Sequence, residues 1–170
     1  MSLMVFRASN FKTPETFPVP KGIKNMLFYV QRSINVNTIV YELNTNQLGE
    51  INKDEPIKFY WVNYSGASDI EPLNYIQKKY AYGLEVKLLD TEKLNYCFNF
   101  VSYKKQILYL INTGDKHYKV YSNFNGKMII VNRIYVHIEG GGFWTPKIKY
   151  IEVQAIDPQN NEMLNEKIVP

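Results

Sequence analysis

Apolar or aromatic residues stand at every second position along several stretches of the chain, including the segment between Lys127 and Glu139. One set of alternate positions holds Met128, Ile130, Asn132, Ile134, Val136 and Ile138, and the other holds Ile129, Val131, Arg133, Tyr135, His137 and Glu139. Successive side chains of a β-strand point to opposite faces of its sheet, so this period is typical of a strand packed against a core. The segment therefore predicts one long strand, with each set on its own face.

Similar runs predict ten strands, and short turn sequences separate most of them. Residues 112–115 (NTGD) and 123–126 (NFNG) are typical of tight hairpin connections. Such connections favour antiparallel neighbours, because a parallel crossover needs a dozen or more residues. The predicted strands span residues 26–31, 36–43, 57–64, 84–89, 95–103, 107–112, 117–122, 127–138, 147–156 and 163–168.

One segment, residues 69–83, breaks the alternation and predicts a short helix. Asp69 is a suitable N-cap, and Pro72 falls in the first turn, where its missing N–H costs nothing. Apolar residues then recur at helical spacing, at Leu73, Ile76 and Tyr80. Gly83 is expected to end the helix in the left-handed conformation.

These elements predict a single all-β domain, an antiparallel barrel or two-sheet sandwich of about ten strands, with one short helix packed over it. Residues 1–25 contain three prolines and a glycine among polar residues and are expected to form an extended N-terminal arm. Residues 26–170 are expected to form the single β domain.

Composition narrows the function classes without selecting one. The net charge is +4, but most of the basic residues are scattered lysines, so a nucleic-acid partner is disfavoured. No stretch approaches the roughly 18 apolar residues of a membrane span. Two histidines and one cysteine, none at ligand spacing, predict no metal site and no cofactor. Cys97 lies in an aromatic run and is expected to be buried.

Several short strings resemble an uncharacterised bacterial family that is known only as a domain of unknown function. They are Phe28 to Ser33, Asn35, Val40-Tyr41, Pro56-Ile57, Tyr60-Trp61, Leu73 and Lys78 to Gly83. The resemblance covers residues 25–169, and the Tyr-Trp and Ala-Tyr-Gly elements carry most of it. The resemblance implies a compact bacterial domain, and several relatives are exported. For this chain it leaves two locations open: export if a signal has been removed, and otherwise the cytoplasm. It brings no activity and no catalytic residues that could be transferred.

Two arginines stand out in a chain that otherwise uses lysine. Arg32 ends a predicted strand beside Asn35, and its five-donor guanidinium suits a carboxylate or phosphate. The alternative for Arg32 is a structural ion pair with an acidic residue. Arg133 shares a predicted strand face with His137 and Glu139, which would suit acid–base chemistry, although a solvated strand face explains the same residues. We assign no catalytic residue.

Aromatic residues supply the remaining candidates. Gly140-Gly141-Gly142-Phe143-Trp144 is an unusual loop, whose aromatics are expected to seal one end of the sheet or, alternatively, to form a stacking surface at its rim. Tyrosine joins an apolar body to a polar tip and is common in ligand pockets as well as in ordinary cores. The candidate ligand-binding residues are Arg32, Asn35, Trp61, Tyr64, Tyr80, Tyr82, Arg133, His137 and Trp144.

Three functions remain open at this level. The first is a non-enzymatic binding domain for a small amphipathic ligand, a glycan or a peptide, with its site near the helix and the Gly140–Trp144 loop. The second is a hydrolase-type enzyme using Arg133, His137 and Glu139. The third is a structural envelope or interaction protein whose aromatic surface contacts another protein.

Overall fold

In the computed structural model, residues 17–66 and 69–170 are described, and they form eleven strands and one short helical segment. The strands are β1 (Met26–Arg32), β2 (Asn35–Leu43), β3 (Ile57–Val62), β4 (Ile70–Glu71), β5 (Leu84–Asp90), β6 (Asn95–Phe100), β7 (Tyr103–Gly114), β8 (His117–Phe124), β9 (Lys127–Gly141), β10 (Pro146–Ile156) and β11 (Met163–Ile168). Each of the ten predicted strands overlaps one of these, and β4 was not predicted.

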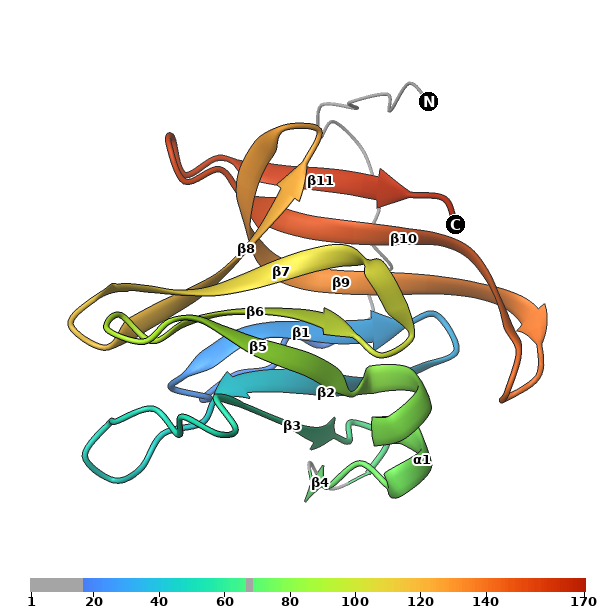
Figure 1. Ribbon diagram of the computed structural model, residues 1–170. Helices are drawn as coiled ribbons and strands as arrows, with labels where there is room; N and C mark the ends of the chain where they lie inside the picture. The colour runs from blue at the N-terminus through green and yellow to red at the C-terminus, as the bar shows by residue number, and fades with distance from the viewer. Residues whose placement is uncertain (1–16, 67–68) are drawn as a thin grey trace.

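The strands form one curled sheet in the order β4-β3-β2-β1-β9-β8-β7-β6-β5, and β10 pairs with both β9 and β11. The sheet bends over on itself as a half-barrel, so β5 to β7 lie over β1 and β2 (Figure 1). Every strand pair is antiparallel except β1 with β9, which is parallel. The predicted all-β class is confirmed, with one parallel pair that the short connections did not indicate.

Strand β9 changes partner in the middle, and this change shapes the whole sheet. Its first residues, 127–130, pair with β8, whereas residues 133–136 pair with β1. On its other edge Val131 pairs with Ala155 and Arg133 pairs with Gln154, so Asn132 is an extra residue, a β-bulge. Because β8 and β1 pair with different parts of the same edge of β9, the sheet divides into two layers that share this strand.

The same bulge overturns the predicted faces of β9. Before it, Ile129 and Val131 are core residues, and after it Ile134 and Val136 pack against that same core. An added residue shifts the alternation by one position, so the inward side chains change from odd to even numbers. The prediction that Met128 to Ile138 share one face is therefore wrong.

The core between the two layers is rich in stacked aromatic rings. Phe28 of β1 is fully buried, lies parallel to Tyr41 of β2 at 4.5 Å between ring centroids, and faces Phe98 of β6 at 6.3 Å. Phe100 meets Phe28 edge-on at 6.2 Å. Offset and edge-on pairs of this kind are favourable arrangements of aromatic rings. They join the layer of β1 and β2 to the layer of β6.

The helical segment differs from its prediction in start, turn type and end. It consists of α1 (Tyr75–Gln77) followed by a π-helical turn, η1 (Lys78–Tyr82). Asn74, not Asp69, is the N-cap. Its side chain accepts from the Gln77 backbone N–H, and its own backbone N–H donates to the Gln77 side chain, which completes a capping box. Gly83 follows in an extended conformation (φ −66°, ψ 161°), not the left-handed one that was predicted.

Cys97 lies on the outer face of β6, which contradicts its predicted burial. Its neighbours Tyr96 and Phe98 are 2% and 1% exposed and point into the core, whereas Cys97 is partly exposed. Aromatic neighbours in a strand occupy the opposite face, because side chains alternate. The prediction placed Cys97 on the wrong face.

A buried carboxylate begins the turn that joins β10 to β11. Asp157 accepts hydrogen bonds from Lys127 Nζ at 2.5 Å and from the Gln159 backbone N–H at 2.9 Å. These two donors hold the pKa of the Asp157 carboxyl below its ordinary value of 3.8, and the Lys127 ammonium has the larger effect. Asp157 is only 3% exposed, so the pair fastens β9 to the β10–β11 hairpin.

We expect Asp157→Asn to destabilise the fold at neutral pH and to have almost no effect near pH 2. A carboxyl whose pKa is lowered by folding stabilises the protein above its unfolded pKa and loses this contribution as the pH falls through the folded pKa. Urea unfolding of both proteins between about pH 2 and 7 measures the difference. Asp54→Asn, at an exposed position, is the control. An equal loss at both ends of the pH range would contradict the assignment.

Candidate functional site

A cavity of about 730 Å³ lies between the two layers at one end of the sheet, and we call it the end cavity. Its buried wall is almost entirely apolar and comes from β1, β7, β8, β9 and β10, through Val30, Leu108, Ser122, Phe124, Val131 and Val153. After the β9 bulge the wall continues along Ile134, Val136 and Ile138. The volume falls within the range of about 300–1,000 Å³ that is usual for small-molecule pockets.

The mouth of the end cavity is formed by four connections that meet at one end of the molecule. They are the β1–β2 turn, the helical segment, the β6–β7 turn and the β9–β10 loop, all on the right in Figure 1. Exposed side chains line this part, including Ile34 at 58%, Tyr80 at 57% and Trp144 at 68% exposure. The mouth therefore combines aromatic and polar groups with an apolar interior.

Arg32 lies at the mouth, at the last position of β1. Its Nη1 donates to the Tyr82 hydroxyl at 3.1 Å, and its Nη2 donates to Asn35 Oδ1 at 3.3 Å. The guanidinium carbon lies 4.6 Å from the centre of the Trp61 ring and 5.7 Å from that of Tyr82. Within residues 17–66 and 69–170, Arg32 has no carboxylate within ion-pair distance. Neutral partners therefore hold this cation in place.

The helical segment is fixed to the same group of residues. Trp61 Nε1 donates to Gln77 Oε1 at 3.2 Å, so the residue that completes the capping box also orients the indole under Arg32. The buried Tyr41 hydroxyl donates to the Tyr82 carbonyl at 2.7 Å, and the Tyr82 ring meets Trp61 edge-on at 5.8 Å. Core packing therefore positions both aromatic partners of Arg32.

The β9–β10 loop places Phe143 and Trp144 at the rim of the mouth. Gly141 has a left-handed conformation (φ 82°), and a Cβ there would lie 2.3 Å from the Thr145 carbonyl oxygen, so only glycine fits. The Phe143 and Trp144 rings meet edge-on at 5.2 Å, and both are more than two-thirds exposed. The preferred prediction, that these aromatics are buried and seal the end, is therefore wrong, and they form the alternative, a rim surface.

Three of the predicted candidates lie away from the end cavity. Tyr64 packs with Tyr29 in a small apolar cluster on the outer face of the sheet. Arg133 is 6% exposed on the outer side of β9, with its guanidinium carbon 5.3 Å from the centre of the Tyr135 ring. Burial lowers the pKa of the Arg133 guanidinium, although Tyr29 and Tyr135 oppose the shift. The bulge at Asn132 turns Arg133 away from the cavity.

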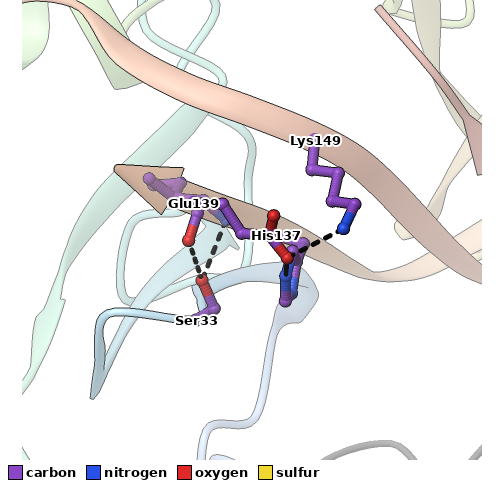
Figure 2. Close-up of polar contacts among 5 residues, drawn as sticks. Ser33, His137, Glu139 and Lys149 are labelled. Carbon is purple, nitrogen blue, oxygen red and sulfur yellow. Dashed lines mark hydrogen bonds and ion pairs between the residues drawn. The ribbon is translucent and has the colours of Figure 1, made fainter. Parts of the chain in front are cut away.

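His137 is the third candidate that lies away from the end cavity, and it belongs to a polar cluster outside it (Figure 2). His137 Nε2 lies 3.0 Å from Glu139 Oε1, which also accepts from Lys149 Nζ at 3.0 Å, and the His137 ring stacks on Tyr150 at 4.5 Å. These two groups lower the pKa of the Glu139 carboxyl, and His137 has the larger effect. The nearby Ser33 hydroxyl donates to the Ile138 carbonyl and accepts from the Ile138 N–H. Its hydrogen bonds are therefore backbone bonds that tie the β1–β2 turn to β9.

Six of the nine candidates therefore belong to the mouth or support it: Arg32, Asn35, Trp61, Tyr80, Tyr82 and Trp144. The sequence did not indicate that Leu108, Ile148, Ile151 and Ile168 line the same cavity. Alternation could place those residues inward but could not show that the two layers separate there. The divergence of β8 from β1 along β9 creates that space.

Among residues 17–66 and 69–170, no group of three or more histidine, cysteine, aspartate or glutamate side chains is placed to hold a metal ion. In the same part of the chain, no helix has the length and apolar character required to cross a membrane.

Comparison with known proteins yields one match. A family model described as "Domain of unknown function (DUF4833)" matches residues 28–167. The matched range contains most of β1, the helical segment, the β9–β10 loop and nearly all of β11, and therefore the four connections that form the mouth of the end cavity. Neither the curated proteins nor the solved structures include a match to this chain.

Proposed function

We propose that this chain, which belongs to the DUF4833 family, is a non-enzymatic binding domain that takes a small amphipathic molecule into the end cavity. The observation that carries the proposal is the cavity itself, about 730 Å³ in volume, with apolar walls and a mouth of aromatic and polar groups. Cavities of this size and lining bury most of the surface of a small ligand.

The construction of the mouth supports binding over catalysis. The groups that meet there are a guanidinium, tyrosine hydroxyls and aromatic rings, which orient a ligand and cover its apolar part. The His137–Glu139 pair lies on the face of β9 that does not line the end cavity, and the Ser33 hydroxyl is hydrogen-bonded to the backbone of β9. The geometry therefore favours recognition of a ligand at this end of the sheet.

Titration with Nile red, an uncharged apolar dye, tests the proposal. We expect saturable binding of one dye per chain, with a rise in fluorescence as the dye leaves water. Trp144→Ala should weaken binding by about 1–3 kcal/mol, the scale of a lost aromatic contact. The stability should change by less than about 0.5 kcal/mol, because the Trp144 side chain is mostly exposed.

Leu48→Ala is the control, because Leu48 is 77% exposed and lies in the β2–β3 connection, away from the end cavity. It should leave both dye affinity and stability unchanged. Absence of saturable dye binding by the wild-type protein would contradict the proposal. A Trp144→Ala variant with wild-type affinity but an unfolding free energy lowered by about 3 kcal/mol would assign Trp144 to the fold and not to the site.

A further inference from the structure

We infer that the ligand of the end cavity is a monoanionic amphiphile, with a carboxylate-type head group at Arg32 and an apolar tail along the inner wall. This inference rests on the proposed function and specifies its ligand. It depends on three features of the cavity: the charge of its lining, the state of the Arg32 guanidinium, and the polar groups of its interior.

Among residues 17–66 and 69–170, Arg32 supplies the one charged side chain that lines the end cavity. The other polar lining side chains are neutral: Gln77, Tyr80, Tyr82, Ser102, Tyr103, Gln106, Ser122 and Trp144. Since none of these described lining side chains is acidic, an entering anion meets no repulsive side-chain charge from them. Since none of them besides Arg32 is basic, they balance a single negative charge and not the double charge of a phosphate monoester.

The Arg32 guanidinium is held firmly but is not neutralised by the part of the chain that the structure describes. A guanidinium has five N–H donors, and Arg32 uses two of them, on Tyr82 and Asn35. Its Nε is buried and has no hydrogen-bond partner among the described residues. A buried donor and an unpaired charge both carry a desolvation cost. A carboxylate at the mouth would offset the cost of the unpaired charge, and the planar fork matches its two oxygens.

The interior of the cavity fixes the direction in which such a molecule would lie. The polar side chains on the inner wall are already paired, because Gln106 Nε2 donates to Ser122 Oγ at 2.7 Å and that hydroxyl donates to the Ile107 carbonyl at 2.7 Å. The rest of this wall is aliphatic or aromatic. It therefore offers burial but no partner for a charge, so the head group belongs at Arg32 and the tail extends inward.

Competition against bound Nile red tests the head group directly. The competitors are dodecanoate, dodecanol and dodecylamine, each below its micellar concentration, because they share one chain and differ only in the head. We expect dodecanoate to displace the dye at a concentration at least tenfold lower than dodecanol, and dodecylamine to be the weakest. Within a series of carboxylates, each added methylene should tighten binding about fourfold until the cavity is filled.

Two variants locate the head group. Arg32→Gln should bring dodecanoate to within about threefold of dodecanol, with both competitors measured against the same bound dye. Lys149→Gln removes the same charge from the outer face of the sheet and should keep the full preference. Circular dichroism and thermal unfolding establish that each variant is folded, and the comparison of the three competitors on the wild-type protein needs no variant.

The outcomes separate this inference from the function on which it rests. If Nile red binds and the three competitors displace it equally, the anionic ligand is wrong while the binding function stands. If the preference for dodecanoate persists in Arg32→Gln, the head group lies elsewhere and the inference is overturned. If neither the dye nor any competitor binds, the proposed function itself fails.

Discussion

Phe28→Ala is expected to lower the free energy of unfolding by about 3–5 kcal/mol, the usual cost of removing a buried aromatic ring. Phe28 is fully buried and contacts rings from both layers, with Tyr41 at 4.5 Å and Phe98 at 6.3 Å. Its removal loses the transfer free energy of the ring and leaves a space that stacked neighbours fill poorly. Urea unfolding monitored by circular dichroism measures the loss.

Phe143→Ala is the matched control, because the same substitution is made at a position that is 69% exposed. Its effect on stability should be within about 0.5 kcal/mol. A loss below about 1.5 kcal/mol for Phe28→Ala would mean that the ring does not join the two layers. Equal losses for the two variants would contradict the assignment of Phe143 to the rim.

The strand pattern could be predicted because it depends on local alternation and on turn residues. All ten predicted strands are present, and the all-β class follows from them. The bulge at Asn132 could not be predicted, since an extra residue in a strand is defined by the partner strand and not by the residues of the strand itself. Its consequence is large, because it decides that Ile134 and Val136 face the cavity and that Arg133 does not.

The candidate site was predicted in part, and for reasons that can be traced to individual residues. Arg32 could be predicted because it is an arginine at a strand end in a lysine-rich chain. A polar group at a strand end can lie at the mouth of a curled sheet. Trp61, Tyr82 and Trp144 were aromatic residues near expected openings. Tyr64 and His137 met similar criteria but occupy the opposite face. The face depends on pairing partners far away in sequence.

The helical segment shows the same limit on a smaller scale. The spacing of its apolar residues indicated a helix. Its end, however, is set by the contact between the Lys78 carbonyl and Gly83, which helix propensities do not describe. Gly83 was assigned a left-handed role, whereas its backbone is extended and any residue could adopt it. The requirement for glycine comes instead from the π-helical turn, which brings the Lys78 carbonyl against the position of a Gly83 side chain.

Gly83→Ala should therefore disturb both the fold and the arrangement of the mouth. A Cβ at Gly83 would lie 1.9 Å from the Lys78 carbonyl oxygen, which belongs to the backbone and cannot rotate away. We expect η1 to open, at a cost of about 1–3 kcal/mol, the usual range for overpacking. Tyr82 precedes Gly83 and would move with it, so the hydrogen bond from Arg32 to the Tyr82 hydroxyl at 3.1 Å would be lost.

Urea unfolding and the dodecanoate–dodecanol comparison measure the two effects of Gly83→Ala on one variant. The preference for dodecanoate should fall several-fold toward that of Arg32→Gln, because the guanidinium loses one of its two hydrogen-bond partners. Gly66→Ala is the control, since a Cβ there meets nothing within 4 Å. Wild-type stability would show that the turn relaxes freely around the added methyl. A lowered stability with an unchanged head-group preference would show that Tyr82 does not position Arg32, and that Trp61 and Asn35 hold the guanidinium in place.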